Sequence, residues 1–383
     1  VEYKSLKELN KKEETFRGIR IVKNVLVSNG KYPVFGGGTN IPFGNYDKWN
    51  LESDSVTINV AGSVGFVDYI KERSWIVDSR YAFLTNKVNH KFLYFALKNI
   101  EPKIKRFKKG AIPGIDMQQL LNLQIPVPPL QIQTKIVEIL DKFTLLEKEL
   151  EKELELRKKQ YEYYRNKLLT FNKNEERERE RELWEITMWN KKFQGINNNM
   201  QTSFNNFTKQ ISAKEMKNLY FSDKGLIRLL STGNFDKCTD EIKTFYIGEV
   251  LTIPGGGGVN GFKNIKYHNG NFINSGNLLA TSLDASKYSL KYLWYWMNMK
   301  KDIIQKMFRG SGIPHPDMAQ ILKMKISIPS INEQNKIVKI LDKFETITNS
   351  LNQGLPKEIN LRKTQYEYYR NKLLDFKTLN NNK

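Results

Sequence analysis

The segment most suggestive of chemistry is a run of glycines, Gly256-Gly-Gly-Val-Asn-Gly261, which matches the G-x-G-x-x-G fingerprint of dinucleotide-binding loops. That fingerprint binds a pyrophosphate only where a helix starts at its end, because the helix N-terminus supplies the N–H groups. Here residues 262–270 follow, and they predict a strand and a turn. We therefore interpret these glycines, and those at 36–38, as strand connections that could approach a DNA backbone closely.

The residue sets of common catalytic centres are missing from the sequence. The single cysteine, Cys238, and the three histidines lie too far apart to predict a zinc site or a Cys–His pair. No Walker lysine loop occurs, and 127–130 lacks the polar and aromatic ends of the Asn/Asp-Pro-Pro-aromatic methyltransferase motif. Asp317 is not followed by the acidic-x-Lys pattern of metal-dependent restriction nucleases, and His315 is interpreted as a turn residue. We predict no catalytic residue, no metal and no cofactor.

Basic and polar residues instead predict a DNA-binding surface. The candidate phosphate ligands are Lys98, Lys103, Lys105, Arg106, Lys108 and Lys109, with Lys263, Lys266 and Arg309 as counterparts further along the chain. The candidate base-reading side chains are Lys31, Tyr32, Asn40, Asn260 and Asn264. A solvated surface without a ligand remains the alternative for each of them.

Net charge is +21, and it is concentrated in two segments. Residues 1–130 carry a net +8 and residues 183–330 a net +9, whereas residues 131–182 are neutral. A compositional bias toward lysine would act everywhere, so the neutral segment argues against that explanation. Two basic regions would attract phosphate backbones.

The chain repeats itself. Lys135–Phe143 returns as Lys336–Phe344 at an offset of 201 residues, and residues 160–169 return unchanged as 365–374 at an offset of 205. The second copy therefore holds four extra residues between these blocks. Each repeat is a globular segment followed by a near-identical helical segment, which predicts two domains and two helical regions.

Heptad spacing of apolar residues from about Leu130 predicts long helices of about 40 residues each, or roughly 60 Å. We expect two globular α/β domains of mixed α+β class, at 1–130 and 183–330, and helical regions at 131–182 and 331–383. An approximate two-fold axis would make the two helices an antiparallel coiled coil. Residues 174–182 are interpreted as a linker or helix tail, and the second helix is predicted to break near residues 354–356.

Some residues off the apolar seam are repeated unchanged, although the globular segments have diverged. Two copies of one partner protein, each binding one half of the chain, would require such identity; recent duplication is the alternative. The candidate partner-binding residues are Glu162, Tyr163, Arg165, Asn166 and Lys167, repeated as Glu367, Tyr368, Arg370, Asn371 and Lys372.

This alternation resembles the specificity subunits of type I restriction–modification enzymes. The resemblance rests on Ile125-Pro-Val-Pro-Pro-Leu with 135–143, on Ile326-Ser-Ile-Pro-Ser-Ile-Asn-Glu-Gln with 336–344, and on the glycines at 62–65 and 255–258. It implies two target-recognition domains that read a bipartite double-stranded DNA target. It also implies two methyltransferase subunits as partners, and two restriction–translocase subunits that may join them. S-adenosylmethionine, ATP and Mg would then belong to the partners.

Other functions remain open. A coiled-coil scaffold could use the same basic domains to bind nucleic acid without sequence preference, or to bind RNA or protein. A self-sufficient enzyme is disfavoured by the missing motifs. No apolar run approaches the roughly 20 residues of a membrane span, and a single cysteine suits a reducing cytoplasm, where we expect the protein.

Overall fold

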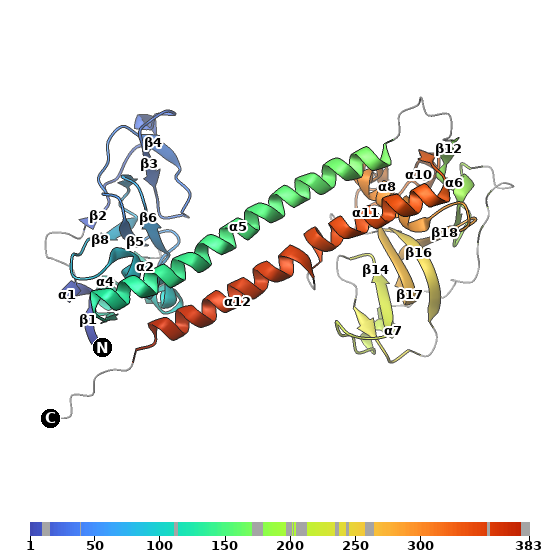
Figure 1. Cartoon of the computed structure of the whole chain (residues 1–383). Helices are drawn as coiled ribbons and strands as arrows, with labels where there is room; N and C mark the ends of the chain where they lie inside the picture. Colours follow the sequence, from blue (N-terminus) through green and yellow to red (C-terminus); the bar gives the residue numbers. More distant parts are fainter. Residues whose placement is uncertain are drawn as a thin grey trace. The chain divides into compact units, whose positions relative to one another are not determined.

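The computed structural model describes residues 1–9, 16–38, 40–110, 114–170, 179–196, 201, 203, 213–233, 237–242, 245–256, 264–350 and 353–376. They form two compact units. The first unit is built from Val1–Lys152 and from the segment that starts at Lys357, and the second is Glu153–Pro356. Each unit combines strands and helices, so the predicted mixed α+β class is confirmed (Figure 1).

The first unit contains two small sheets. The strands of one follow the order β2-β8-β5-β6 and are all antiparallel, and those of the other follow β4-β3-β7, with β3 parallel to β7. These strands are β2 (Phe16–Arg17), β3 (Tyr32–Phe35), β4 (Gly44–Tyr46), β5 (Ser55–Asn59), β6 (Val67–Ile70), β7 (Trp75–Ile76) and β8 (Arg80–Phe83). The β-branched residues of β5 favour a strand, and all five of its residues are buried.

Helix α2 (His90–Asn99) packs on β5 and β6. The Asn89 side chain caps it by accepting hydrogen bonds from the main-chain N–H groups of Lys91 and Phe92. Apolar residues at 92, 93, 96 and 97 have the spacing typical of an amphipathic helix. The remaining elements are β1 (Glu2–Ser5), α1 (Leu6–Leu9), η1 (Lys23–Val25), α3 (Glu101–Ile104), η2 (Lys105–Phe107), β9 (Lys108–Lys109), β10 (Gly114–Ile115), α4 (Met117–Leu121) and β11 (Gln124–Val127).

The second unit contains one six-stranded sheet of order β13-β18-β16-β17-β14-β15. Only β14 and β17 pair in parallel; the other neighbours are antiparallel. The strands are β13 (Thr187–Trp189), β14 (Ile227–Ser231), β15 (Cys238–Thr239), β16 (Tyr246–Pro254), β17 (Lys266–Ser275) and β18 (Asn277–Ser282).

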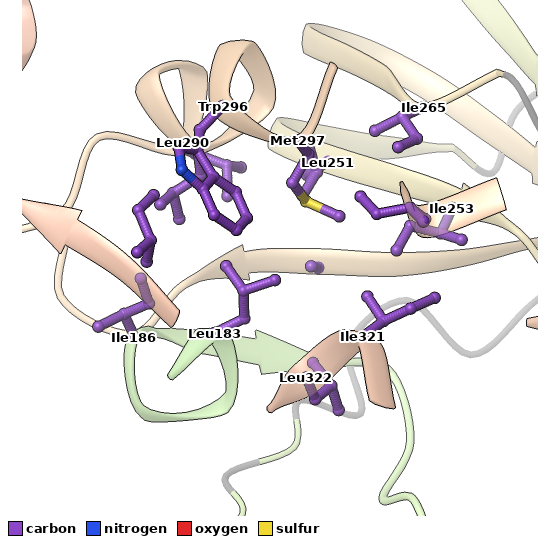
Figure 2. Packing of buried hydrophobic residues seen from close by; sticks show 14 of the residues in the cluster. Leu183, Ile186, Leu251, Ile253, Ile265, Leu290, Trp296, Met297, Ile321 and Leu322 are labelled. Atoms are coloured by element: carbon purple, nitrogen blue, oxygen red, sulfur yellow. The ribbon is translucent and has the colours of Figure 1, made fainter. Parts of the chain in front are cut away.

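The main core of the second unit lies between this sheet and α8 (Leu290–Met299). Figure 2 shows Trp296 and Met297 of α8 near Leu251 of β16, with Leu183 from α6 closing the cluster. The other elements are α6 (Leu183–Ile186), α7 (Ala213–Lys217), α9 (Lys301–Gln305), β19 (Phe308–Arg309), β20 (His315–Pro316), α10 (Met318–Leu322), β21 (Lys325–Ile328) and β12 (Arg179–Glu182).

The long helices begin where the sequence predicts. Helix α5 (Leu130–Leu169) has 40 residues, whereas its repeat is split into α11 (Ile331–Asn349) and α12 (Gly354–Leu374). Gly354 has a φ of +73°, and a Cβ there would lie 2.4 Å from the Thr346 carbonyl oxygen, so the break requires glycine. The predicted interruption is confirmed, and Pro356 lies in the first turn of α12, where its missing N–H does no harm.

Residues at the start of each long helix belong to the globular cores. Ile136 and Leu140 are buried in the first unit, and Ile337 and Leu341 in the second. The apolar seam that predicts helix pairing therefore also attaches each helix to the sheet-bearing part of its own unit.

Further along, aromatic side chains join helices within each unit. Phe143 of α5 stacks on Tyr369 of α12 at 5.5 Å between ring centroids, and Lys363 of α12 pairs with Glu147 and Glu151 of α5. In the second unit, Phe344 of α11 stacks on Tyr164 of α5 at 5.6 Å.

The prediction for residues 174–182 is wrong where the structure describes them. Arg179–Glu182, assigned to a linker or helix tail, forms β12 and pairs with β21, because its main chain completes the two-stranded ladder next to α6. Residues 174–178 lie outside the described residues. Within the part that the structure describes, no helix is long and apolar enough to cross a membrane.

Both ends of the described chain meet in the first unit. The Tyr3 hydroxyl of β1 donates a hydrogen bond to the Phe376 carbonyl oxygen at 2.8 Å. Leu374 at the end of α12 is buried in the same core as residues of α2 and β5. The fold of the first unit therefore needs residues from both ends of the sequence.

Candidate nucleic-acid interface

The glycines after β3 form a loop that is held at three consecutive carbonyl groups. Arg80 Nε donates to the Gly36 oxygen at 2.7 Å, and the Asn59 amide donates to the Gly38 oxygen at 3.0 Å. Between them, the N–H of Ser63 donates to the Gly37 oxygen at 2.6 Å. The loop is thus fixed to the turn that follows β5.

Glycine is required in that turn. Gly62 has a φ of +77°, and a Cβ there would lie 2.5 Å from the Gly37 oxygen. The glycines at 36–38 were interpreted as a strand connection, and those at 62–65 were part of the family resemblance. The structure brings the two segments together as one fixed loop pair.

Arg80 is fully buried. An arginine is almost never fully buried unless its charge is paired. One of its terminal nitrogens donates to the Thr57 hydroxyl at 3.0 Å and lies 2.9 Å from the Asp68 carboxylate. Burial lowers the pKa of Arg80, and the Asp68 carboxylate opposes that shift. Arg80 was not predicted from the sequence; the one signal was a charged residue directly before the apolar run at 81–84.

The predicted base readers of the first half lie on both sides of β3. Asn40 is exposed two residues after Gly38. Tyr32 lies in β3 rather than in a loop, paired with Tyr46, and the Lys31 ammonium sits 5.4 Å from its ring centroid. Lys31 and Tyr32 therefore lie at the start of β3, and Asn40 lies after its end.

The basic cluster divides into two kinds of residue. Glu101 is buried and holds Lys98 at 2.5 Å and Lys105 at 2.6 Å. Burial alone would raise the pKa of Glu101, but hydrogen bonds from Lys105 and Lys98 outweigh it, so the pKa lies below its ordinary value. Lys98 is half-buried and attaches α2 to α3, whereas Lys105 remains exposed at the surface.

The other members of the cluster are exposed along α3, η2 and β9: Lys103, Arg106, Lys108 and Lys109. Lys109 lies 3.8 Å from Asp116, the N-cap residue of α4. In the second unit Arg309 of β19 is exposed in the same way and lies 3.2 Å from Asp317, the N-cap residue of α10. The two units thus present matching basic hairpins.

Two second-half candidates hold the main chain. Lys266 donates to the Ser231 oxygen at 2.7 Å, and Asn264 donates to the Thr232 oxygen at 3.0 Å, so both support the loop after β14. Asn260 and Lys263 lie outside the described residues. His315, predicted in a turn, lies in β20, with Nδ1 2.6 Å from the Gly255 oxygen.

The candidate partner-binding residues have the same exposure in both copies. Glu162, Tyr163, Asn166 and Lys167 are exposed, Arg165 is half-buried, and Glu367, Tyr368, Asn371, Lys372 and Arg370 repeat that pattern. The lysine of each set lies over the tyrosine, with Lys167 at 6.0 Å from the Tyr163 centroid and Lys372 at 5.7 Å from that of Tyr368.

In the first unit part of this set lines a cavity of about 660 Å³. Tyr368, Asn371 and Lys372 form one wall, and Asn99 and Ile125 lie on the other. Arg370 donates to the Asn99 side chain at 3.1 Å. Among the described residues, no group of three or more His, Cys, Asp or Glu side chains could hold a metal ion.

The fold of this chain is shared with solved proteins. It is similar to the solved type I restriction–modification S subunit from M. genitalium, with a TM-score of 0.69 over 98% of this chain and 96% of that one, at 18% identity. A solved chain from work on complex assembly of the type I R-M system aligns over 97% of both chains, with a TM-score of 0.57 at 12% identity.

Sequence comparisons agree with the fold. The chain is 32% identical to the type I restriction enzyme EcoR124I/EcoR124II specificity subunit of Escherichia coli, over 76% of this chain and 72% of that protein. A Haemophilus influenzae protein named as a type I restriction enzyme specificity subunit is 29% identical, over 98% and 96%. The family model "Type I restriction modification DNA specificity domain" matches residues 1–156 and 170–361, so the chain belongs to that family.

Proposed function

We propose that this chain reads a bipartite double-stranded DNA target, with one half-site for the globular domain at 1–130 and the other for that at 183–330. The observation that carries the proposal is the pair of sheet-bearing domains with matching basic hairpins but different side chains around the loops after β3 and β14. Common surfaces suit the phosphate backbone, which is the same in every sequence, and diverged loops suit base edges, which differ.

In this proposal two methyltransferase subunits bind the repeated residues on α5 and α12, and two restriction–translocase subunits can join them. The equal exposure of both residue sets supports one kind of partner for both halves. The chain itself is a non-catalytic subunit without a cofactor. S-adenosylmethionine, ATP and Mg²⁺ would be bound by the partners, and the protein would work in the cytoplasm, where the DNA is.

Methylation mapping tests this function. The chain would be co-purified with its methyltransferase subunit and the methylated genomic sites sequenced. We expect two short half-sites with a fixed gap, and replacement of residues 183–330 by the equivalent domain of a relative should change one half-site only. A change in both halves would contradict independent reading, and binding without sequence preference would favour the scaffold.

The non-catalytic role has its own test. The purified chain alone, given DNA and labelled S-adenosylmethionine, is expected to transfer no methyl group. The assignment would be contradicted if the DNA became labelled and this transfer activity stayed with the chain through further purification steps.

A further inference from the structure

Two sets of polar contacts join each globular domain to the long helix that follows it, and both sets occur in both units. The first set centres on a buried glutamine one turn into the helix. Gln133 in α5 accepts a hydrogen bond from the N–H of Asn89 at 2.8 Å and donates to the Pro128 oxygen at 2.7 Å. Its side chain thus ties the start of α2 to the start of α5.

The second unit repeats this arrangement at the same position in the repeat. Gln334 in α11 accepts from the N–H of Ser289, the N-cap residue of α8, at 2.8 Å, and donates to the Pro329 oxygen at 2.8 Å. Gln133 and Gln334 are 1% and 0% exposed, so truncating either would leave main-chain groups without their buried partner.

The second set is an ion pair two turns further along the helix. Lys91 of α2 lies 2.5 Å from Asp141 of α5, and its ammonium is 5.7 Å from the Tyr69 ring centroid. The Tyr69 hydroxyl donates to Asp54 at 2.8 Å, which extends the connection into the sheet.

The second unit has the same chain of groups. Lys291 lies 2.7 Å from Asp342 and 5.4 Å from the Tyr267 ring centroid. The Tyr267 hydroxyl donates to Glu249 at 2.6 Å. Both sets are therefore kept in the two domains, although many side chains around them differ.

Apolar packing at the same junction does not require such groups. Ile136 and Leu140 already bury the helix against the domain, and cores tolerate many apolar combinations of similar volume. Directional hydrogen bonds from a fully satisfied polar network add something different, because they fix one rotation and one register of the helix on the domain.

We propose that Gln133, Lys91 and Asp141, with Gln334, Lys291 and Asp342, are positioning residues that fix the orientation of each globular domain on its helix. If the chain reads two half-sites, as proposed above, the same residues would set the gap at which they are read. The orientation itself does not depend on that function.

The two junctions differ in one respect. Asp342 also accepts a hydrogen bond from the Tyr295 hydroxyl at 2.5 Å, whereas the corresponding residue of α2 is Phe95, which has no hydroxyl. Loss of Lys91 should therefore loosen the first junction more than loss of Lys291 loosens the second.

Distance measurements between spin labels test the orientation in the full chain. After Cys238→Ser, labels at Lys71→Cys and Lys148→Cys report on the first junction, and labels at Asn269→Cys and Lys343→Cys on the second; all four positions are exposed. We expect one narrow distance in each parent. Lys91→Met with Gln133→Met should broaden the first distribution, and Lys291→Met alone should broaden the second less than Lys91→Met broadens the first.

Controls separate orientation from folding. Lys142→Met, an exposed substitution next to Asp141, and Lys91→Arg, which keeps the charge, should leave the distance narrow. Lys91→Met alone is the milder variant if the double variant unfolds. An unchanged distribution in a folded Lys91→Met chain overturns the proposal. Methylation mapping of the unsubstituted protein tests the proposed function separately. If that protein directs methylation to no bipartite target, the proposed function is wrong. The measured distances still decide whether these residues position the domain on its helix.

Discussion

The two globular domains share a strand plan but differ in its continuity. In the first unit β6 and β7 are separate strands in two sheets, whereas in the second unit the single strand β17 takes both roles and joins six strands into one sheet. In both units the strand before the loop described above pairs in parallel with its neighbour: β3 pairs with β7, and β14 pairs with β17. The order and direction of the strands are therefore the same in both units, although the sheet is divided in the first unit and continuous in the second.

The same comparison reveals an exchange of charge. Thr57 of β5 pairs with Asp68 of the neighbouring strand β6. On the other neighbouring strand, β8, Arg80 lies two residues before the residue that pairs with Thr57. At the matching positions around Thr252 of β16, the second unit has Lys266 and Asn277. The buried cation of the first unit and the half-buried Lys266 of the second therefore lie on opposite sides of the central strand.

Both arrangements serve the same purpose. Arg80 and Asn59 hold the carbonyl groups of the loop after β3. In the second unit Asn277 and Lys266 hold the last two carbonyl groups of β14, and Asn264 holds the first one after it. The comparison teaches that a fixed loop is kept while the groups that fix it are replaced. Such replacement is what two readers of different half-sites would need.

Removal of Arg80 should have the largest effect. Arg80→Met leaves the mostly buried Asp68 without its cation, and breaking such a pair costs about 3–5 kcal/mol. Asn277→Leu, the matched change in the second unit, removes neutral hydrogen bonds and should cost about 1–3 kcal/mol. Amide hydrogen exchange of β5–β8 and of β16–β18 measures each domain separately. Equal losses of protection would mean that the charge exchange has no energetic consequence.

The glycine turns should respond unequally as well. Gly62→Ala places a side chain on a residue with φ of +77°, which costs about 1–2 kcal/mol, and drives its Cβ into the Gly37 oxygen. Gly256→Ala meets side-chain atoms rather than main chain, the ring of His315 at 2.7 Å and a methyl group of Ile313 at 3.3 Å, at a residue without a positive φ. We expect Gly62→Ala to reduce discrimination at the first half-site in competition binding, with the second half-site read as before. A similar effect of both substitutions would show that the two turns are equally constrained.

Sequence reasoning was most successful where spacing along the chain sets the structure. The heptad pattern and the prolines fixed the start of α5 at Leu130, and the repeat offset with Gly354 located the break between α11 and α12. The fold class and the family resemblance followed from the same repeats.

Sequence reasoning was weakest where the outcome depends on which strands pair. Arg80 meets Gly36 and Asp68 only through the sheet, so neither contact can be inferred from a single sequence. Lys98 is a partial exception, because Glu101 stands three residues later and four before Lys105, a spacing that indicates ion pairs on one helical face. The assignment of bases and phosphates to residues stays a prediction.

The basic hairpins should contribute to affinity alike in both domains. Arg106→Ala, Lys108→Ala and, in the second unit, Arg309→Ala should each lower the slope of log affinity against log salt by about one and leave half-site preference unchanged. Lys98→Ala is the contrasting control, because its ammonium is held by Glu101 and Val67. A changed target preference in the hairpin variants would reassign those residues to base reading.

The smallest expected effect concerns Glu345, whose repeat position is Thr144 in α5. Burial, and then the nearby negative charge of Asp342, raises the pKa of Glu345 above 4.5. Its charged form is therefore unfavourable in the fold, and stability should fall as pH rises from 4.5 through the raised pKa. Glu345→Gln should stabilise the second unit at neutral pH, and the gain should vanish in denaturation below pH 4.5. A gain in stability that persists below pH 4.5 would contradict the explanation by the buried Glu345 carboxylate. An equal gain in stability from Thr144→Gln in the first unit would contradict it as well.

The meeting of Tyr3 with Phe376 has a consequence for biosynthesis. A chain emerging from the ribosome delivers Glu153–Pro356 in one piece, so the second unit can fold while translation continues. The first unit must wait for the segment that starts at Lys357, since Leu374 fills part of its core. Until then the nascent protein exposes apolar surface around α2. Of the two units, the one whose synthesis starts earlier is therefore the later to mature and the more in need of a chaperone.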